Sequence, residues 1–144
     1  MRVLVQRVSE ARVKVHGHVT GEIGHGVLLL VGFEKSDSES QIDTLLSKVL
    51  NYRLFNDDEG RMNLSLLDVG GELLVVSQFT LVADTKKGLR PSFSSSAPPE
   101  VAEGLYHLFV QRAIQLVPVQ TGQFGEHMEV SLINQGPATF MFSD

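Results

Sequence analysis

The chain contains no cysteine, which excludes disulfide bonds, a thiolate nucleophile and cysteine-ligated zinc. It also has no long apolar run, since the longest, Val27 to Val31, is far too short to span a membrane. The first residues lack the basic segment followed by an apolar one that marks a secretory signal peptide. These absences predict a cytoplasmic protein, and the lack of cysteine is compatible with a reducing environment.

Common cofactor and metal motifs are missing as well. There is no Gly-x-x-x-x-Gly-Lys-Ser/Thr phosphate loop, no Gly-x-Gly-x-x-Gly turn and no His-Glu-x-x-His sequence. The acidic run Asp57 to Gly60 fails the calcium-loop spacing, because Phe55 and Leu66 stand where carboxylate ligands are required. His16 and His18 form a pair without a third ligand, which is a weak metal signal. We therefore expect no metal and no cofactor.

The composition is that of an ordinary folded domain. Of 144 residues, 42% are hydrophobic and 20% are charged, which is typical of one globular domain over residues 1–144. The net charge of -5 argues against a long nucleic-acid interface, because phosphate neutralisation needs many clustered cations. Contact with one RNA end is compatible, since Lys86, Lys87 and Arg90 form the densest basic cluster. A solvated loop explains these charges equally well.

The N-terminal third has the two-residue periodicity of half-buried β-strands. Val3, Val5 and Arg7 share one face of a strand, and the residues between them lie on the other face. Val13 and Val15 repeat this alternation. Arg7 interrupts an apolar face, and such a charge usually indicates that the face is exposed. Further strands are predicted from apolar residues at 27–33, 73–76, 130–133 and 139–142.

Two amphipathic helices are predicted. The first spans Ser38 to Tyr52, where apolar residues recur at three- and four-residue spacing after a serine that can cap the helix. The second opens at Pro98-Pro99-Glu100, because proline is tolerated in a first helical turn, with Ser96 as a candidate cap. Its predicted buried stripe consists of Val101, Leu105, Leu108, Phe109, Ala113 and Leu116.

Many short strands with two helices predict an α+β fold. No regular strand–helix–strand alternation is visible in the pattern. We therefore expect a strongly curved or closed, barrel-like β-sheet with the two amphipathic helices packed outside it.

A polar tetrad, Ser77-Gln78-Phe79-Thr80, follows the strand at 73–76. Backbone N–H groups become free at a strand end, and ester hydrolysis needs such donors because charge develops on the carbonyl oxygen. The side chains of Ser77, Gln78 and Thr80 add short-range hydrogen bonding. The alternative is a strand end that is satisfied by its own Ser and Thr side chains.

A serine or threonine nucleophile would need a base within hydrogen-bond reach. The chain has no Gly-x-Ser-x-Gly elbow, and no histidine lies near Ser77 or Thr80 in the sequence. His107 and His127 remain candidates, because residues distant in sequence can meet in the fold.

A second motif, Asn134-Gln135-Gly136-Pro137-Ala138-Thr139, lies close to the C-terminus. Gly-Pro commonly marks a turn, so a strand-to-strand turn is the simplest interpretation. An alternative concerns Arg7, whose guanidinium could donate to backbone carbonyls near Gly136-Pro137 and hold their orientation.

The two motifs, in this order and in a chain of this length, resemble the D-aminoacyl-tRNA deacylases, which hydrolyse D-amino acids from tRNA. The resemblance covers the whole chain and includes Met1 to Val8, Asn63 to Leu66 and Lys87 to Phe93. It implies a homodimeric esterase that acts on the ester between a D-amino acid, or mischarged glycine, and the 3′-terminal adenosine of tRNA.

In this family, backbone donors around Gln78 and Phe79 stabilise the oxyanion. Ser77 and Thr80 position the substrate, and a ribose hydroxyl of the tRNA itself assists. The resemblance thus assigns the tetrad a catalytic role without a covalent intermediate on Thr80.

The resemblance also implies that Gly136-Pro137 is a cis dipeptide whose parallel carbonyl oxygens enter the partner subunit's active site. Rigid carbonyls near the substrate's α-carbon would exclude an L side chain and accept a D side chain or glycine. A Cβ at position 136 would crowd this approach. Phe124 and Met128 would line the adenosine or aminoacyl pocket, although core packing is their simplest interpretation. The full predicted substrate-binding set is Gly136, Pro137, Asn134, Phe124, Met128, Arg7, Lys86 and Lys87.

Two alternatives stay open. One is a non-catalytic module that binds RNA ends or protein partners on the same scaffold. The other is a relaxed relative in which a trans Gly136-Pro137 bond admits some L-aminoacyl-tRNAs. The chain also differs from the family's usual small residue and Asp at Glu126 and His127, and from its usual Val at Ala138, which bears on fine specificity.

Overall fold

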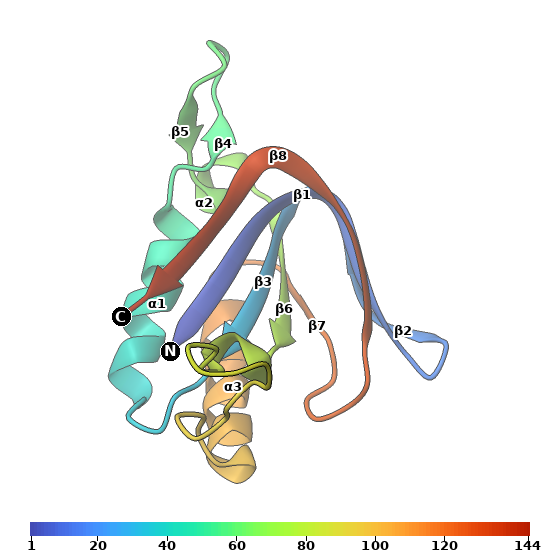
Figure 1. The fold of residues 1–144 in the computed structure, drawn as a ribbon. Helices are drawn as coiled ribbons and strands as arrows, with labels where there is room; N and C mark the ends of the chain where they lie inside the picture. The colour runs from blue at the N-terminus through green and yellow to red at the C-terminus, as the bar shows by residue number, and fades with distance from the viewer.

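The computed structural model describes residues 1–144 and contains a six-stranded sheet that curls toward a closed barrel (Figure 1). The elements in chain order are β1 (Arg2–Val15), β2 (His18–Ile23), β3 (Gly26–Gly32), α1 (Glu39–Asn51), β4 (Phe55–Asn56), β5 (Met62–Leu64), α2 (Leu66–Val69), β6 (Glu72–Ser77), the 3-10 helix η1 (Phe79–Val82), α3 (Pro99–Ile114), β7 (Val119–Thr121) and β8 (Glu129–Ser143). The predicted α+β class and strongly curved sheet are confirmed.

The curvature follows from the length of β1. Its first half pairs with β3, its second half pairs with β2, and β8 runs antiparallel along both halves. β1 and β8 therefore arch together over the top of Figure 1. The free end of the sheet curls back until β2 approaches β7, where a Cβ on Gly21 would lie 2.3 Å from the Thr121 carbonyl oxygen. Glycine at position 21 therefore permits the near closure.

The two strands predicted at 130–133 and 139–142 are one strand, β8, in the structure. Thr139 pairs with Gln6 and Asn134 pairs with Val8, so four residues of β8 oppose Arg7 alone. We call residues 135–138 the Gly-Pro bulge. The prediction of a strand-to-strand turn here is wrong, because the chain continues in the same direction along the same partner strand.

The structure contains two parallel strand pairs that the sequence pattern did not reveal. β3 is parallel to β6, and β6 is parallel to β7. The crossovers between them carry α1 and α3, so the prediction that strand–helix–strand units are absent is wrong. Both helices cover one face of the sheet.

The predicted first helix is confirmed as α1. Its buried residues lie on one face, and the Ser38 N–H donates to Gln41 Oε1 at 2.7 Å at its start. The buried residues are Ile42, Leu45, Leu46, Val49 and Leu50. A short helix of four residues, α2, was not predicted. No helix is long and apolar enough to cross a membrane.

The predicted second helix is α3, but part of its predicted buried stripe is wrong. Val101 is 48% exposed and Leu116, beyond the helix end, is 59% exposed. Phe109 and Ala113 are buried as predicted, and the helix also buries Ala102 and Tyr106. Its small alanines let it approach the sheet closely. Ser96 is not the cap, because Pro98 occupies that position.

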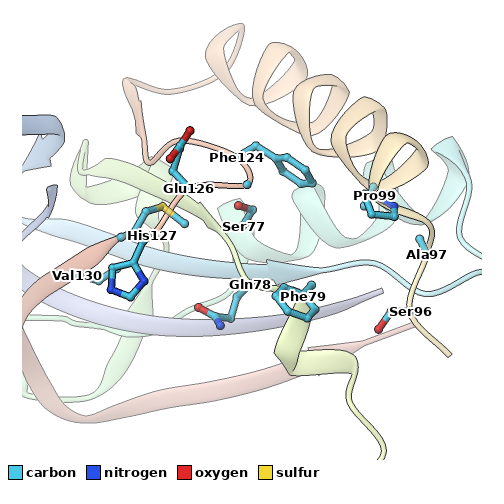
Figure 2. A pocket seen from close by; sticks show the side chains of 13 residues that line it. Ser77, Gln78, Phe79, Ser96, Ala97, Pro99, Phe124, Glu126, His127 and Val130 are labelled. Carbon is cyan, nitrogen blue, oxygen red and sulfur yellow. The ribbon is translucent and has the colours of Figure 1, made fainter. Parts of the chain in front are cut away.

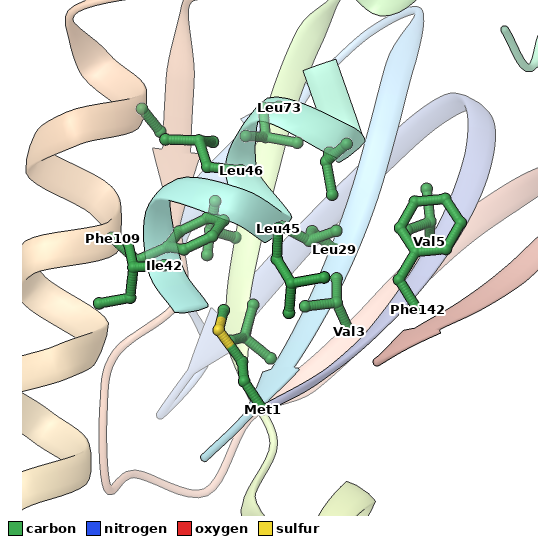
Figure 3. Packing of buried hydrophobic residues seen from close by; sticks show 14 of the residues in the cluster. Met1, Val3, Val5, Leu29, Ile42, Leu45, Leu46, Leu73, Phe109 and Phe142 are labelled. Atoms are coloured by element: carbon green, nitrogen blue, oxygen red, sulfur yellow. The ribbon is translucent and has the colours of Figure 1, made fainter. Parts of the chain in front are cut away.

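The main core lies between the sheet and the two long helices (Figure 3). Met1 contributes a fully buried side chain, and its ammonium donates to Asp37 at 2.6 Å and Asp144 at 3.0 Å. Burial lowers the pKa of this ammonium, but the hydrogen bonds and charges of the two carboxylates outweigh burial and raise it above 8.0. The contacts hold both ends of the chain together, as Figure 1 shows.

Candidate active site

A pocket of about 440 Å³ opens where β6 ends, a volume typical of small-ligand sites. Figure 2 shows Ser77, Gln78 and Phe79 along one wall, with Phe124 facing them beneath α3. The lining residues are Ser77, Gln78, Phe79, Ser96, Ala97, Pro99, Ala102, Phe124, Gly125, Glu126, His127, Met128 and Val130. Five residues proposed from the sequence therefore meet in one cavity.

The tetrad is positioned by the junction between β6 and η1. The Gln78 N–H donates to the Val31 carbonyl at 2.7 Å, which ties the strand end to β3. The helix η1 begins at Phe79, so the N–H groups of its first residues have no acceptor within the helix. Thr80 does not line the pocket, but its Oγ1 accepts a hydrogen bond from the Gln78 side-chain amide. The Phe79 N–H is thus a free backbone donor at the pocket wall, whereas the Gln78 N–H is already bonded.

The opposite wall is held by Tyr106 and Gly122. The Tyr106 hydroxyl donates to the Val75 carbonyl at 2.9 Å, and its ring centroid lies 5.7 Å from that of Phe124. Burial raises the pKa of Tyr106 to about 12, so this phenol stays protonated near neutral pH. A Cβ on Gly122 would lie 2.6 Å from Met128 Sδ. Glycine at that position therefore lets the methionine lie against the wall.

Several lining residues were not singled out as site residues from the sequence. Ser96 is the most informative, because its Oγ is buried without any hydrogen-bond partner. Small residues such as Ser96, Ala97 and Ala102 carry no sequence signal that separates pocket lining from core. Only the fold identifies them.

The two histidines considered as candidate bases, His107 and His127, lie in different places. His127 lines the pocket, whereas His107 lies on α3 with Nε2 3.6 Å from Glu103. Neither histidine forms a hydrogen bond with Ser77 or Thr80. The geometry of a hydroxyl nucleophile activated by histidine is therefore not formed in this structure.

Arg7 and the Gly-Pro bulge form a second cluster. The prediction of an exposed face at Arg7 is wrong, because the residue is only 7% exposed. Its Nε donates to the Gln135 carbonyl at 3.0 Å and its Nη1 to the Leu54 carbonyl at 2.6 Å. Asn134 Nδ2 donates to the Arg7 carbonyl at 3.0 Å and to that of Ala138 at 3.3 Å. The bulge is therefore anchored on both sides of its Gly-Pro pair.

The Gly136–Pro137 bond is cis, and both residues are exposed. An added Cβ on Gly136 would meet one atom of its own chain, Asn134 Oδ1, at 3.3 Å, a tight contact that a small shift of this side chain would relieve. Packing inside this chain therefore gives only one side-chain contact as a reason for glycine here.

The bulge and the pocket lie at opposite ends of the parallel strands. Asn134 pairs with Val8, and Val8 pairs with Gly26 at the start of β3. Ser77 pairs with Val31 near the end of β3. Five residues of strand separate these levels, roughly 16 Å at the usual rise per residue. One small ligand group cannot contact both sites of the same chain.

Lys86 and Lys87 lie outside the pocket, on a loop that follows η1. Asp84 and Ser92 close this loop with two backbone hydrogen bonds of 2.8 and 3.0 Å. We call residues 84–92 the basic loop. No cluster of three or more His, Cys, Asp or Glu side chains that could hold a metal ion is present in the structure.

Comparison with known proteins agrees with the resemblance drawn from the motifs. A D-aminoacyl-tRNA deacylase from Histophilus somni (strain 2336) is 56% identical over 140 residues, covering 97% of each chain. Another from Pseudoalteromonas translucida (strain TAC 125) is 56% identical over 141 residues, with the same coverage.

Two solved structures share the fold. The c-Myc DNA unwinding element binding protein is 34% identical, with a TM-score of 0.95 over 100% of this chain and 99% of its own. A probable eukaryotic D-amino acid tRNA deacylase is 20% identical, with a TM-score of 0.81 over 98% and 97%, which shows likeness of fold alone. A family model described as D-Tyr-tRNA(Tyr) deacylase matches residues 4–143. The chain therefore belongs to the D-Tyr-tRNA(Tyr) deacylase family.

Proposed function

We propose that this protein hydrolyses the ester between a D-amino acid and the 3′-terminal adenosine of tRNA, and that it also accepts mischarged glycine. As a member of its family, the chain is a hydrolase of D-aminoacyl-tRNA. The observation that carries the detailed proposal is the convergence of Ser77, Gln78, Phe79, Phe124 and Met128 on one pocket. Because its substrate is found with the translation machinery, we assign the protein to the cytoplasm.

The chemistry uses hydrogen-bond donors rather than a protein nucleophile. Water attacks the ester carbonyl, and the developing negative charge on its oxygen is stabilised by the backbone N–H of Phe79, because the N–H of Gln78 already donates to the Val31 carbonyl. Ser77 positions the aminoacyl ester from the pocket wall, and Thr80, outside the lining, acts through the Gln78 side-chain amide that donates to its hydroxyl. A ribose hydroxyl of the substrate assists the proton transfers, as the family resemblance implies.

Selection against L-amino acids is assigned to Gly136 and Pro137 of a partner subunit. The bulge is exposed and stands roughly 16 Å along the strands from its own pocket, so it can reach only a pocket on another chain. Within its own chain a Cβ on Gly136 would press only on the Asn134 side chain, which supports an additional, external reason for glycine. Backbone carbonyls near the substrate's α-carbon would occupy the space that an L side chain needs. Glycine, which has only hydrogen there, and a D-amino acid, whose side chain points elsewhere, would still fit.

This arrangement requires a homodimer. An apolar row of Leu4, Leu30 and Met141 crosses three adjacent strands, β1, β3 and β8. Met141 is 53% exposed, and the row lies on the face of the sheet that α1 and α3 do not cover. A two-fold interface could bury such a row on both subunits. Lys86 and Lys87 then contribute contacts to the acceptor end of the tRNA.

The test is deacylation of matched D-, L- and glycyl-tRNA without metal ions. Hydrolysis of the D and glycyl esters, with the L ester spared, is the expected result. Hydrolysis of the L ester at a comparable rate would contradict selection by exclusion. No hydrolysis of any ester would contradict the enzymatic proposal and favour a module that only binds RNA ends or protein partners.

A further inference from the structure

Two aromatic rings lie side by side at the mouth of the pocket. Phe79 lines the pocket and is 59% exposed, while Phe93 is 40% exposed and stands outside the lining. Their ring centroids are 5.0 Å apart with a 53° angle between the planes. The pair therefore extends an apolar surface from the cavity outward over the protein surface.

Phe93 is held at the foot of the basic loop. The Asp84–Ser92 bridge closes the loop directly before it, and the Ser96 N–H donates to the Phe93 carbonyl at 3.0 Å. Ser95 Oγ donates to the Val82 carbonyl at 3.0 Å, which joins this segment to η1. These bonds tie the backbone on both sides of Phe93 to the segment that follows the tetrad.

The basic loop, which directly precedes Phe93, carries positive charges that no carboxylate of the protein neutralises. Lys86, Lys87 and Arg90 are exposed, and none of them forms an ion pair with a carboxylate of the protein. The chain has a net charge of -5 and only twelve Lys and Arg residues. Three of these twelve lie within the five positions from 86 to 90. Such a small cationic patch suits one or two phosphates rather than a long nucleic acid.

We infer that Phe93 is a stacking platform for the penultimate base of the tRNA 3′ end, with the cations of the basic loop on the adjoining phosphates. The inference rests on the proposed function, which puts the terminal adenosine in the pocket. The next nucleotide leaves by the pocket mouth, where the exposed face of Phe93 is the nearest aromatic surface beyond Phe79. Aromatic stacking beside cations is the usual way in which proteins hold unpaired nucleotides.

The experiment is a binding cycle that does not depend on catalysis. Fluorescence anisotropy would measure Kd for an uncharged acceptor-stem RNA hairpin ending in CCA, and for the same hairpin with an abasic penultimate nucleotide. Phe93→Ala should weaken binding of the CCA hairpin roughly tenfold, within the range for one stacked base, and leave binding of the abasic hairpin unchanged. Phe93→Trp should restore the affinity, and Leu89→Ala, which alters a fully exposed side chain, is the matched control.

Two outcomes would overturn the inference. Equal weakening of both hairpins would mean that Phe93 acts by supporting Phe79 or the fold, and no weakening of either would mean that it contacts no RNA. Failure of the proposed function would look different, because wild-type protein would then hydrolyse neither D-aminoacyl-tRNA nor a D-aminoacyl-adenosine. An intact enzyme should show the Phe93→Ala defect in KM for the tRNA substrate and not for the adenosine ester, which lacks the stacked base.

Discussion

Replacing Arg7 with alanine tests how the Gly-Pro bulge is held. The guanidinium is nearly buried and has no carboxylate partner, so its charge is balanced by the carbonyls of Gln135 and Leu54. A hydrogen bond from a charged donor contributes about 1.5–3 kcal/mol, and Leu54 is fully buried, so its carbonyl would lose a partner that water cannot easily replace. Removal of a buried cation recovers part of its desolvation cost.

We therefore expect Arg7→Ala to lower the free energy of unfolding by about 2–4 kcal/mol, measured by urea denaturation. The Gln135 carbonyl would also lose the donor that fixes the bulge beside Gly136. If this bond contributes about 1.4 kcal/mol to the rigidity of the bulge, the rate preference for D- over L-tyrosyl-tRNA falls roughly tenfold.

The assay compares kcat/KM for both esters at a temperature where wild type and variant are fully folded. Arg7→Lys keeps the charge but cannot donate along two directions from one planar group, so it should recover little of the preference. An unchanged D/L preference in a folded, destabilised Arg7→Ala protein would refute the reasoning. Arg7 would then support stability alone.

Three further predictions concern the pocket and the N-terminus. Phe79→Pro and Phe79→Ala both remove the ring, but only proline removes the N–H, so kcat should be lower for proline by roughly 10²–10³; equal values would contradict an oxyanion role for this N–H. His127→Ala should keep kcat within about threefold, whereas a loss of 10² or more would identify a general base. Acetylation of Met1 should destabilise the protein most below pH 8. The pKa of the ammonium is raised in the folded state, so its stabilising charge is present below pH 8 and is lost as the pH rises through the raised pKa. A pH-independent difference between acetylated and free protein in urea denaturation would contradict this.

Local signals predicted much of the fold. The two-residue alternation of Val3 and Val5 identified β1, and the helical spacing of apolar residues identified α1. The tetrad was recognised at the end of β6 because four apolar residues precede it. These features depend on neighbours within a few positions, which a sequence pattern records directly.

Features that depend on distant contacts were missed. The bulge is set by pairing between β8 and β1, and Arg7 meets Gln135 across 128 positions. The face of α3 was misplaced because Tyr106 enters the core with its hydroxyl on the Val75 carbonyl, while Val101 stays exposed. A pattern that counts apolar residues cannot anticipate a buried phenol whose partner lies on another element.

The measurement that most directly tests a site shared between subunits is complementation of two inactive variants. Gly136→Ala should fold, since a shift of a few tenths of an ångström in the Asn134 side chain makes room for its Cβ, yet block the partner's pocket. Phe79→Pro should disable its own pocket and leave its bulge intact. Random pairing of equal amounts gives half heterodimers with one complete site each, so D-aminoacyl-tRNA hydrolysis should return to about a quarter of wild type. A mixture that stays inactive although heterodimers form would contradict the shared site.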